Sequence, residues 1–216
     1  MRLPTRLVAS LSVLALTSSP GSASSPSRAN STFPTDGICL VGTNSASEVD
    51  ASGEFSVTVR HASNLPIQGS TVTVNFNACT PDIVVSSLQP FPGMSVVCNG
   101  ARGVVSGQTN NLGVATFRIA GGGAGTSSGT LTACAEIRAN NVYFSTVRVA
   151  LLDQVGALDG ANPNDLAVAI TDINSGADLA RDDLDYDGHS RPNDLANMIH
   201  RVNAGGSAHN TGAICP

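Results

Sequence analysis

The stretch D-L-D-Y-D-G-H-S-R-P-N-D, residues 183–194, constrains the fold of this chain more than any other feature. It places carboxylates at alternate positions, a glycine at the sixth position and another acid at the twelfth. Calcium takes roughly six to eight oxygen ligands, and a loop with this spacing can supply them from one segment. The glycine permits a backbone bend that a Cβ would obstruct. The sequence therefore predicts a calcium-binding loop followed by a helix.

The spacing also assigns a role to each expected ligand of the calcium ion. We expect side-chain oxygens from Asp183, Asp185 and Asp187, the backbone carbonyl of His189, and both carboxylate oxygens of Asp194. The alternative interpretation is a solvated acidic turn in front of a helix. Five matches at the correct spacing, followed by a helical apolar pattern, favour the metal site.

A weaker copy of this loop lies upstream, because D-G-A-N-P-N-D-L-A (159–167) matches D-G-H-S-R-P-N-D-L-A (187–196) with one residue missing. Val155 and Ala157 occupy the positions expected for its first ligands. We therefore expect a degenerate second site formed by Asp153, Asp159 and Asp165.

Each loop is followed by apolar residues at helical spacing, namely Leu166, Ile170 and Ile173, then Leu195, Ile199 and Val202. A short amphipathic helix cannot bury its apolar face alone, so we expect the two helices to pack against each other.

Charge is distributed unevenly along the chain. Residues 24–150 carry six acids and six arginines, whereas residues 151–216 carry ten acids and three arginines, a net charge of −7. An acidic segment of this kind either stays unfolded or binds cations. The chain has no basic stripe that could neutralise phosphates, which argues against a nucleic-acid partner.

The tandem of loop–helix units over residues 153–203 resembles a type I dockerin, and aspartate in place of glutamate at the twelfth position is typical of that variant. Dockerins are non-catalytic modules that fold around calcium and bind cohesin modules. The resemblance implies that Asp183, Asp185, Asp187 and Asp194 are ligands and that a cohesin-like protein is the partner. Partner-reading positions fall at Asn193 and Asn164, where dockerins often have a Ser-Thr-like pair.

The N-terminal segment predicts export. Arg2 and Arg6 precede an apolar run at 7–16 and small residues up to Ala23, as in a signal peptide cleaved after residue 23. No stretch approaches the ~20 apolar residues of a membrane-spanning helix. We expect a secreted or cell-surface protein.

Export makes disulfides the default for the five cysteines. Cys79 and Cys98 flank a Pro-rich excursion and are expected to pair, with Cys39–Cys134 as a second pair. Cys215 is then unpaired or replaces one of these partners, because spacing alone does not fix connectivity.

Residues 36–152 alternate apolar and polar residues in about seven segments with turns between them, which predicts a β-sandwich. The segments N-L-P-I-Q-G-S-T-V-T-V-N-F, T-N-N-L-G-V-A-T-F-R-I and G-T-L-T-A resemble bacterial Ig-like domains of the invasin type, which are usually spacers or adhesive modules. The predicted organisation is a signal peptide (1–23), a flexible linker (24–35), an Ig-like β-sandwich (36–152), the dockerin-like pair (153–203) and a tail (204–216).

Few residues suggest catalysis or sugar binding. Glu54 and Glu136 could form a carboxylate pair, but both are expected to point outward, and His61 is expected at a surface turn. The Gly121–Gly125 run is expected to form a flexible hairpin. Without Trp, the aromatic platform for a polysaccharide would need Tyr143 and Tyr186, and both are expected at the surface; carbohydrate binding is therefore possible but unsupported.

These observations predict a secreted, non-catalytic protein whose calcium-binding tail docks it to another protein. An alternative is a surface adhesin whose Ig-like domain binds an external ligand. A third is an accessory subunit in polysaccharide degradation.

Overall fold

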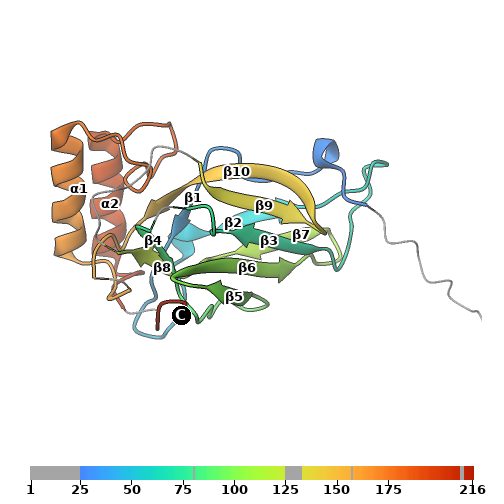
Figure 1. Ribbon diagram of the computed structural model, residues 1–216, viewed down its shortest axis with the longest axis horizontal. Helices are drawn as coiled ribbons and strands as arrows, with labels where there is room; N and C mark the ends of the chain where they lie inside the picture. Colours follow the sequence, from blue (N-terminus) through green and yellow to red (C-terminus); the bar gives the residue numbers. More distant parts are fainter. Residues whose placement is uncertain (1–24, 80, 125–132, 157, 210–211) are drawn as a thin grey trace, which may run out of the picture.

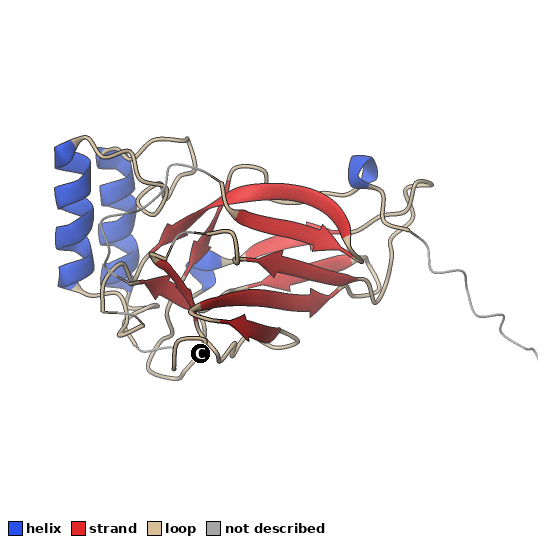
Figure 2. Ribbon diagram, viewed as in Figure 1, coloured by secondary structure: helices blue, strands red, loops and turns tan. Residues whose placement is uncertain are grey.

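The computed structural model describes residues 25–79, 81–124, 133–156, 158–209 and 212–216. The expected signal peptide (1–23) lies outside these residues. The described chain is mainly β and ends in two helices that stand side by side at one end of the β structure (Figures 1 and 2). None of the helices in the described ranges has the length and apolar character needed to cross a membrane.

The strands fall into one large sheet and two short ladders. The elements are β1 (Gly37–Leu40), β2 (Phe55–Thr58), β3 (Thr71–Asn75), β4 (Ile83–Val85), β5 (Ser95–Asn99), β6 (Arg102–Gln108), β7 (Val114–Phe117), β8 (Gly121–Gly123), β9 (Ala135–Ala139), β10 (Val142–Leu151), and the short 3-10 turns η1 (Arg28–Asn30) and η2 (Ala51–Gly53). The six-stranded sheet has the order β1-β10-β9-β3-β6-β5, and β2–β7 and β4–β8 form the two ladders. β1 runs parallel to β10, whereas the other pairs are antiparallel.

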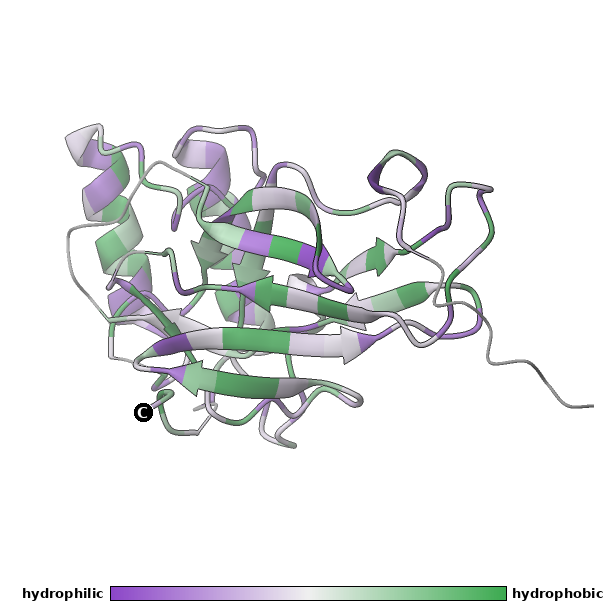
Figure 3. Cartoon of the chain, turned by 45° about the vertical axis from the view of Figure 1, so that its right-hand side comes forward, coloured by the Kyte–Doolittle hydropathy of each residue, from purple (hydrophilic) through white to green (hydrophobic). Residues whose placement is uncertain are grey.

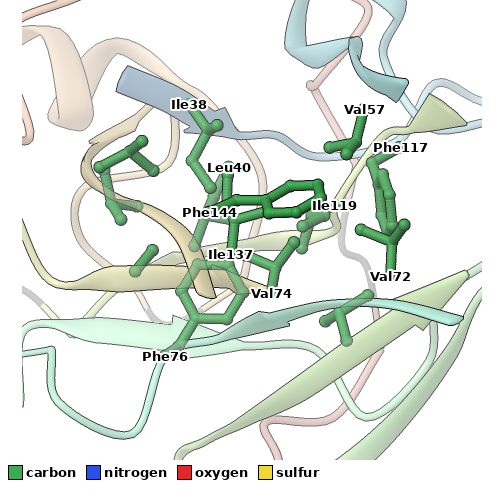
Figure 4. Close-up of a cluster of buried hydrophobic side chains, with 14 of the residues drawn as sticks. Ile38, Leu40, Val57, Val72, Val74, Phe76, Phe117, Ile119, Ile137 and Phe144 are labelled. Atoms are coloured by element: carbon green, nitrogen blue, oxygen red, sulfur yellow. The ribbon is translucent and has the colours of Figure 1, made fainter. Parts of the chain in front are cut away.

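The alternating pattern located most of the strands. Six of the expected segments correspond to β2, β3, β6, β7, β9 and β10, and each of these strands contributes buried apolar side chains. Val72 and Val74 of β3, with Phe117 of β7 and Ile137 of β9, belong to one hydrophobic core (Figure 4). Hydrophobic and hydrophilic residues alternate along several of the strands (Figure 3). The mainly β prediction is therefore confirmed, in the form of a curled sheet with two added ladders.

The glycine run is the clearest departure from the expected β structure. Gly121–Gly123 form β8, which is buried and pairs with β4, whereas we expected a flexible hairpin from residue 121 to 125. A Cβ on Gly122 would lie 2.8 Å from the carbonyl oxygen of Asp153. β8 has no room for side chains because it lies against the backbone of Asp153 and Gln154, where the chain enters the first loop. Residue 125 itself lies outside the described ranges.

Helices α1 (Pro163–Ser175) and α2 (Pro192–Ala204) begin and end in the same way. Each has proline at the first helical position, where the missing N–H costs no hydrogen bond. Each ends at a left-handed glycine, Gly176 or Gly205, which any residue with a Cβ would adopt only with strain. The duplicated sequence therefore gives a duplicated helix.

The helices bury a face that is rotated by about one position from the expected stripe. Ala169 and Met198 are almost fully buried, whereas Ile170 and Ile199 are 38% and 39% exposed. The reason is that the helices pack on the end of the sheet as well as on each other. Their core unites residues of both regions: Cys39, Val41, Val49, Ala150, Leu152, Ala161, Ala169, Leu184 and Met198.

The segments at both ends of the described chain are attached to the β region. Ser27 N donates to Arg60 O (2.8 Å) and Thr32 pairs with Thr58, so the described part of the expected flexible linker is hydrogen-bonded to the neighbouring chain. The tail returns to the β region, where Cys215 N donates to Val85 O (2.9 Å).

The disulfide prediction was wrong in its pairing. The bonds are Cys79–Cys134 and Cys98–Cys215, and Cys39 is a buried free thiol. Cys79 follows β3 and Cys134 precedes β9, and these strands are neighbours in the sheet. Strand pairing, rather than separation along the chain, therefore decides which cysteines meet.

Candidate metal centre

Three of the expected ligands meet in the second loop. Asp183, Asp185 and Asp187 each present a carboxylate oxygen, and these oxygens lie within 4.8 Å of one another. In the part of the chain that the structure describes, no other three acidic, histidine or cysteine side chains form such a group. Gly188, at φ +95°, makes the bend that folds the loop back over them. The sequence therefore identified the carboxylate cluster correctly.

Asp183 is the buried member of the cluster, with 1% of its surface exposed. Its Oδ2 accepts from Gly188 N (3.0 Å) and from Arg148 Nη1 (3.0 Å), and Arg148 belongs to β10. Its Oδ1 is also buried but has no hydrogen-bond partner among the described residues. A buried carboxylate oxygen without a partner is costly unless a cation or a water satisfies it.

The other two members of the cluster are exposed and are held by the loop itself. Asp185 Oδ1 accepts from Asp187 N (3.1 Å), and its other oxygen accepts from the Asn193 side chain. Asp187 Oδ1 accepts from His189 N (2.9 Å), and its Oδ2 pairs with Arg191 Nη1 (3.2 Å). We expected Asn193 and Asn164 to contact a partner protein. Asn193 contacts Asp185, a candidate metal ligand, whereas Asn164 is exposed on α1.

Asp194 lies at the end of the loop, outside the group of three carboxylates. Its Oδ1 accepts from the backbone N–H of Leu184 (2.9 Å) and Asp185 (3.0 Å), and its Oδ2 accepts from Arg191 N (2.9 Å). It therefore closes the loop and caps α2, and it is not one of the three clustered carboxylates. Burial raises the pKa of this carboxyl group. A carboxylate oxygen can accept more than one contact, so bidentate ligation by Asp194 stays a prediction.

The histidine and the tyrosine of the loop point away from the cluster. His189 Nδ1 lies 2.9 Å from Asp178 Oδ2, and this contact lowers the pKa of Asp178. Tyr186 is half-buried, where we expected an exposed ring: a Cβ on Gly37 would lie 2.2 Å from its Cδ1. Burial raises the pKa of the Tyr186 phenol. The ring thus packs the loop onto β1.

The first loop repeats the framework of the second. Asp153 Oδ2 accepts from Gly160 N (3.0 Å), and Asp153 Oδ1 is buried without a partner among the described residues. Asp165 Oδ1 accepts from Gln154 N (2.7 Å) and Val155 N (2.8 Å), and its Oδ2 accepts from Asn162 N (2.7 Å). Asp153 therefore corresponds to Asp183, and Asp165 to Asp194.

This correspondence corrects the alignment of the first loop. Asp153 and Gly160 are seven positions apart, whereas Asp183 and Gly188 are five positions apart. Because the first loop has two more residues before its glycine, the sequence alignment matched Val155 to a ligand position that Asp153 occupies in the structure. Ala157 lies outside the described residues. Asp159 is exposed and accepts from the Asn162 amide (3.3 Å), so the three expected acids do not form a cluster like that of the second loop. Burial raises the pKa of Asp153 to about 7.

A buried ion network, which sequence reasoning missed, fixes the chain that enters the second loop. Arg181 Nη1 lies 2.9 Å from Asp82 Oδ2, and its Nη2 lies 2.5 Å from Asp172 Oδ2 on α1. Arg181 and Asp82 are 4% and 1% exposed. The network joins the β region, α1 and the loop, and no local sequence pattern indicates such a long-range contact.

The acids considered for catalysis have partners of their own. Glu54 pairs with Arg118 (2.7 Å) and Glu136 with Arg138 (2.5 Å). His61 Nδ1 lies 3.0 Å from Ser63 Oγ in the same turn. Glu54 and Glu136 therefore each belong to an ion pair with a neighbouring arginine, and His61 belongs to a turn.

The second loop fits a calcium ion by its donor set. It brings together hard oxygen donors, one of them a buried oxygen without a partner, and it bends at a glycine as a calcium loop requires. Comparison of the chain with protein-family models, with curated proteins and with solved structures finds no match.

Proposed function

We propose that this chain is a secreted, non-catalytic protein in which an Ig-like β-sandwich carries a dockerin-like, calcium-binding helical pair. The observation that carries the proposal is the unpartnered, buried Oδ1 of Asp183 within the three-aspartate cluster. The site residues would be Asp183, Asp185 and Asp187, with Asp194 and the carbonyl of His189 as further ligands. Calcium, when bound, would neutralise the loop and hold its entry into α2.

Charge supports a divalent ion at this position. The loop contains four carboxylates, of Asp183, Asp185, Asp187 and Asp194, and two guanidiniums contact them, one from Arg148 and one from Arg191. Two negative charges are left, which matches one divalent cation.

A docking role is supported by the outer face of the helical pair. Ile170 of α1 and Ile199 of α2 occupy equivalent positions 29 residues apart, and both are more than one-third exposed. Asn164 is exposed at the start of α1 and its counterpart Asn193 at the start of α2. Calcium would order this duplicated surface, and a cohesin-like module is the proposed partner.

The proposal is tested by calorimetric calcium titration of the full chain after treatment with a chelator. Asp183→Asn should abolish binding at the second loop, because it removes the charge of the buried ligand. Asp182→Asn is the matched control, since Asp182 is adjacent and equally buried but outside the cluster. A wild-type protein that takes up no calcium, or equal loss in both variants, would refute the proposal.

The docking step needs its own measurement. A purified cohesin module, immobilised on a sensor surface, should retain the wild-type chain in calcium and release it in chelator. Replacing Ile170 and Ile199 with serine should weaken retention without changing calcium affinity. Retention that is indifferent to these replacements would exclude this helical face.

The adhesin alternative is supported by a different surface. Leu65 and Leu112 are 64% and 65% exposed, and they lie on neighbouring turns, since a Cβ on Gly113 would be 3.0 Å from the Cβ of Pro66. If ligand capture by intact cells expressing the chain is lost in Leu65→Ser/Leu112→Ser but kept in Asp183→Asn, the adhesin is favoured over docking.

A further inference from the structure

A cleft of about 450 Å³ lies at the junction of the β region and the helical pair. Four separate parts of the chain form it: residues 44–51 between β1 and β2, residues 90–92 between β4 and β5, Arg118 after β7, and Gly206 after α2. Its volume is in the range of small-ligand pockets, roughly 300–1,000 Å³. The site lies outside both loops described above.

One side of the cleft is apolar and rigid. Pro90, Phe91 and Pro92 line it, and Phe91 also packs against the core beneath the helices. Arg118 covers the Phe91 ring, with its guanidinium carbon 5.0 Å from the ring centroid. The same guanidinium is 2.7 Å from Glu54 Oε2, so its charge is already balanced.

The other side carries two carboxylates, Glu48 and Asp50. Within the described residues, neither carboxylate forms an ion pair: Arg118, the cation that lines the cleft, pairs with Glu54, and Arg201 donates to the backbone carbonyl of Ser52 (3.5 Å). Both are held in place by neutral donors: Glu48 Oε2 accepts from Asn44 Nδ2 (2.9 Å), and Asp50 Oδ2 accepts from Ser207 Oγ (2.7 Å). Each carboxylate can accept further hydrogen bonds. The cleft is thus an apolar slot with two unbalanced negative charges.

We propose that this cleft binds a lysine side chain presented by a partner protein. A lysine has an apolar stem that can pack on the prolines and a compact ammonium group that can reach Glu48 and Asp50. An arginine would gain most by stacking on the aromatic face, which Arg118 already covers. The chain contains no lysine, so the occupant comes from another molecule.

The test uses the full, isotope-labelled chain in saturating calcium, which neutralises the acidic loop. Nα-acetyl-lysine amide is the probe, and Nα-acetyl-norleucine amide is its uncharged counterpart. We expect the lysine probe to shift the amide resonances of residues 44–51 and 91, with a Kd on the order of 1–10 mM, as suits so small a ligand. The norleucine probe should bind at least about tenfold more weakly.

Glu48→Gln should weaken the lysine probe about fivefold or more, because it removes one of the two charges. Glu136→Gln is the matched control, since Glu136 is a surface acid of the β region that is paired with Arg138. Equal binding of both probes, shifts confined to residues 183–194, stronger binding of methyl glucoside, or no effect of Glu48→Gln would overturn the proposal. Because the readout is confined to the cleft, its failure is distinct from a failure of calcium binding.

Discussion

Replacing Arg181 with methionine should destabilise the protein strongly, because it removes the cation beside the buried Asp82 and the partly buried Asp172. Arg181 contacts Asp82 Oδ2 at 2.9 Å and Asp172 Oδ2 at 2.5 Å, and its side chain is 4% exposed. Methionine fills much of the volume but carries no charge. Breaking a buried ion pair from one side costs about 3–5 kcal/mol.

For a chain of this size, that cost corresponds to a decrease in Tm of roughly 6–20 °C. Urea unfolding followed by circular dichroism measures the free energy of unfolding. The calcium affinity should also decrease, because Arg181 fixes the chain two residues before Asp183.

The matched control is Arg138→Met, which removes the guanidinium of an exposed pair with Glu136. Exposed pairs contribute only about 0–1 kcal/mol, so this variant should be nearly neutral. The double variant Asp82→Asn/Arg181→Met should recover part of the loss, because it removes one of the two stranded charges. A cost for Arg181→Met no larger than that of Arg138→Met would refute the reasoning.

Three further predictions follow from the loops and their support. Arg148→Gln should tighten calcium binding several-fold, because it removes a competing cation 3.0 Å from Asp183 Oδ2, and calorimetry would expose an unchanged or weaker affinity as a contradiction. In chelator, stability should decrease as pH rises from about 4 to about 7: burial raises the pKa of Asp153 and of Asp182 to about 7, so the folded protein keeps protons that the unfolded chain has already released near pH 4. Urea unfolding across this range should show a shallower slope for Asp182→Asn, and an equal slope would contradict the assignment. Gly122→Ala should lower the free energy of unfolding by more than about 2 kcal/mol, since its Cβ would lie 2.8 Å from the Asp153 carbonyl oxygen. The control Gly93→Ala has open space around its Cβ and should cost only the roughly 1–2 kcal/mol of its positive φ. Equal melting temperatures of the two variants would contradict a steric clash at β8.

Much of the framework was predictable because it depends on local patterns. Alternation of apolar and polar residues marked β3 and β7, since one face of each strand is buried. The short strands β4 and β8 were missed: β4 is apolar at every position, and β8 consists of glycines, so neither has a period to detect. The helical stripe was displaced for a related reason, because the sequence could not indicate that the end of the sheet covers Ala169 and Met198.

The candidate site divides in the same way. The spacing of Asp183, Asp185 and Asp187 was sufficient to predict their cluster, because ligands within one short loop are placed by that loop alone. The first loop was misaligned because its two additional residues before Gly160 were invisible until hydrogen bonds showed that Asp153 matches Asp183.

The sequence by itself determined the elements that local chemistry specifies: the alternating strands, the two proline-started helices and the aspartate loop. Tertiary structure decided which distant groups meet. It joined Cys98 to Cys215, placed Arg181 between Asp82 and Asp172, and set Arg148 beside Asp183. These contacts link residues between 9 and 117 positions apart. Their partners are selected by strand order and by packing of the helices on the sheet, and no local pattern records either.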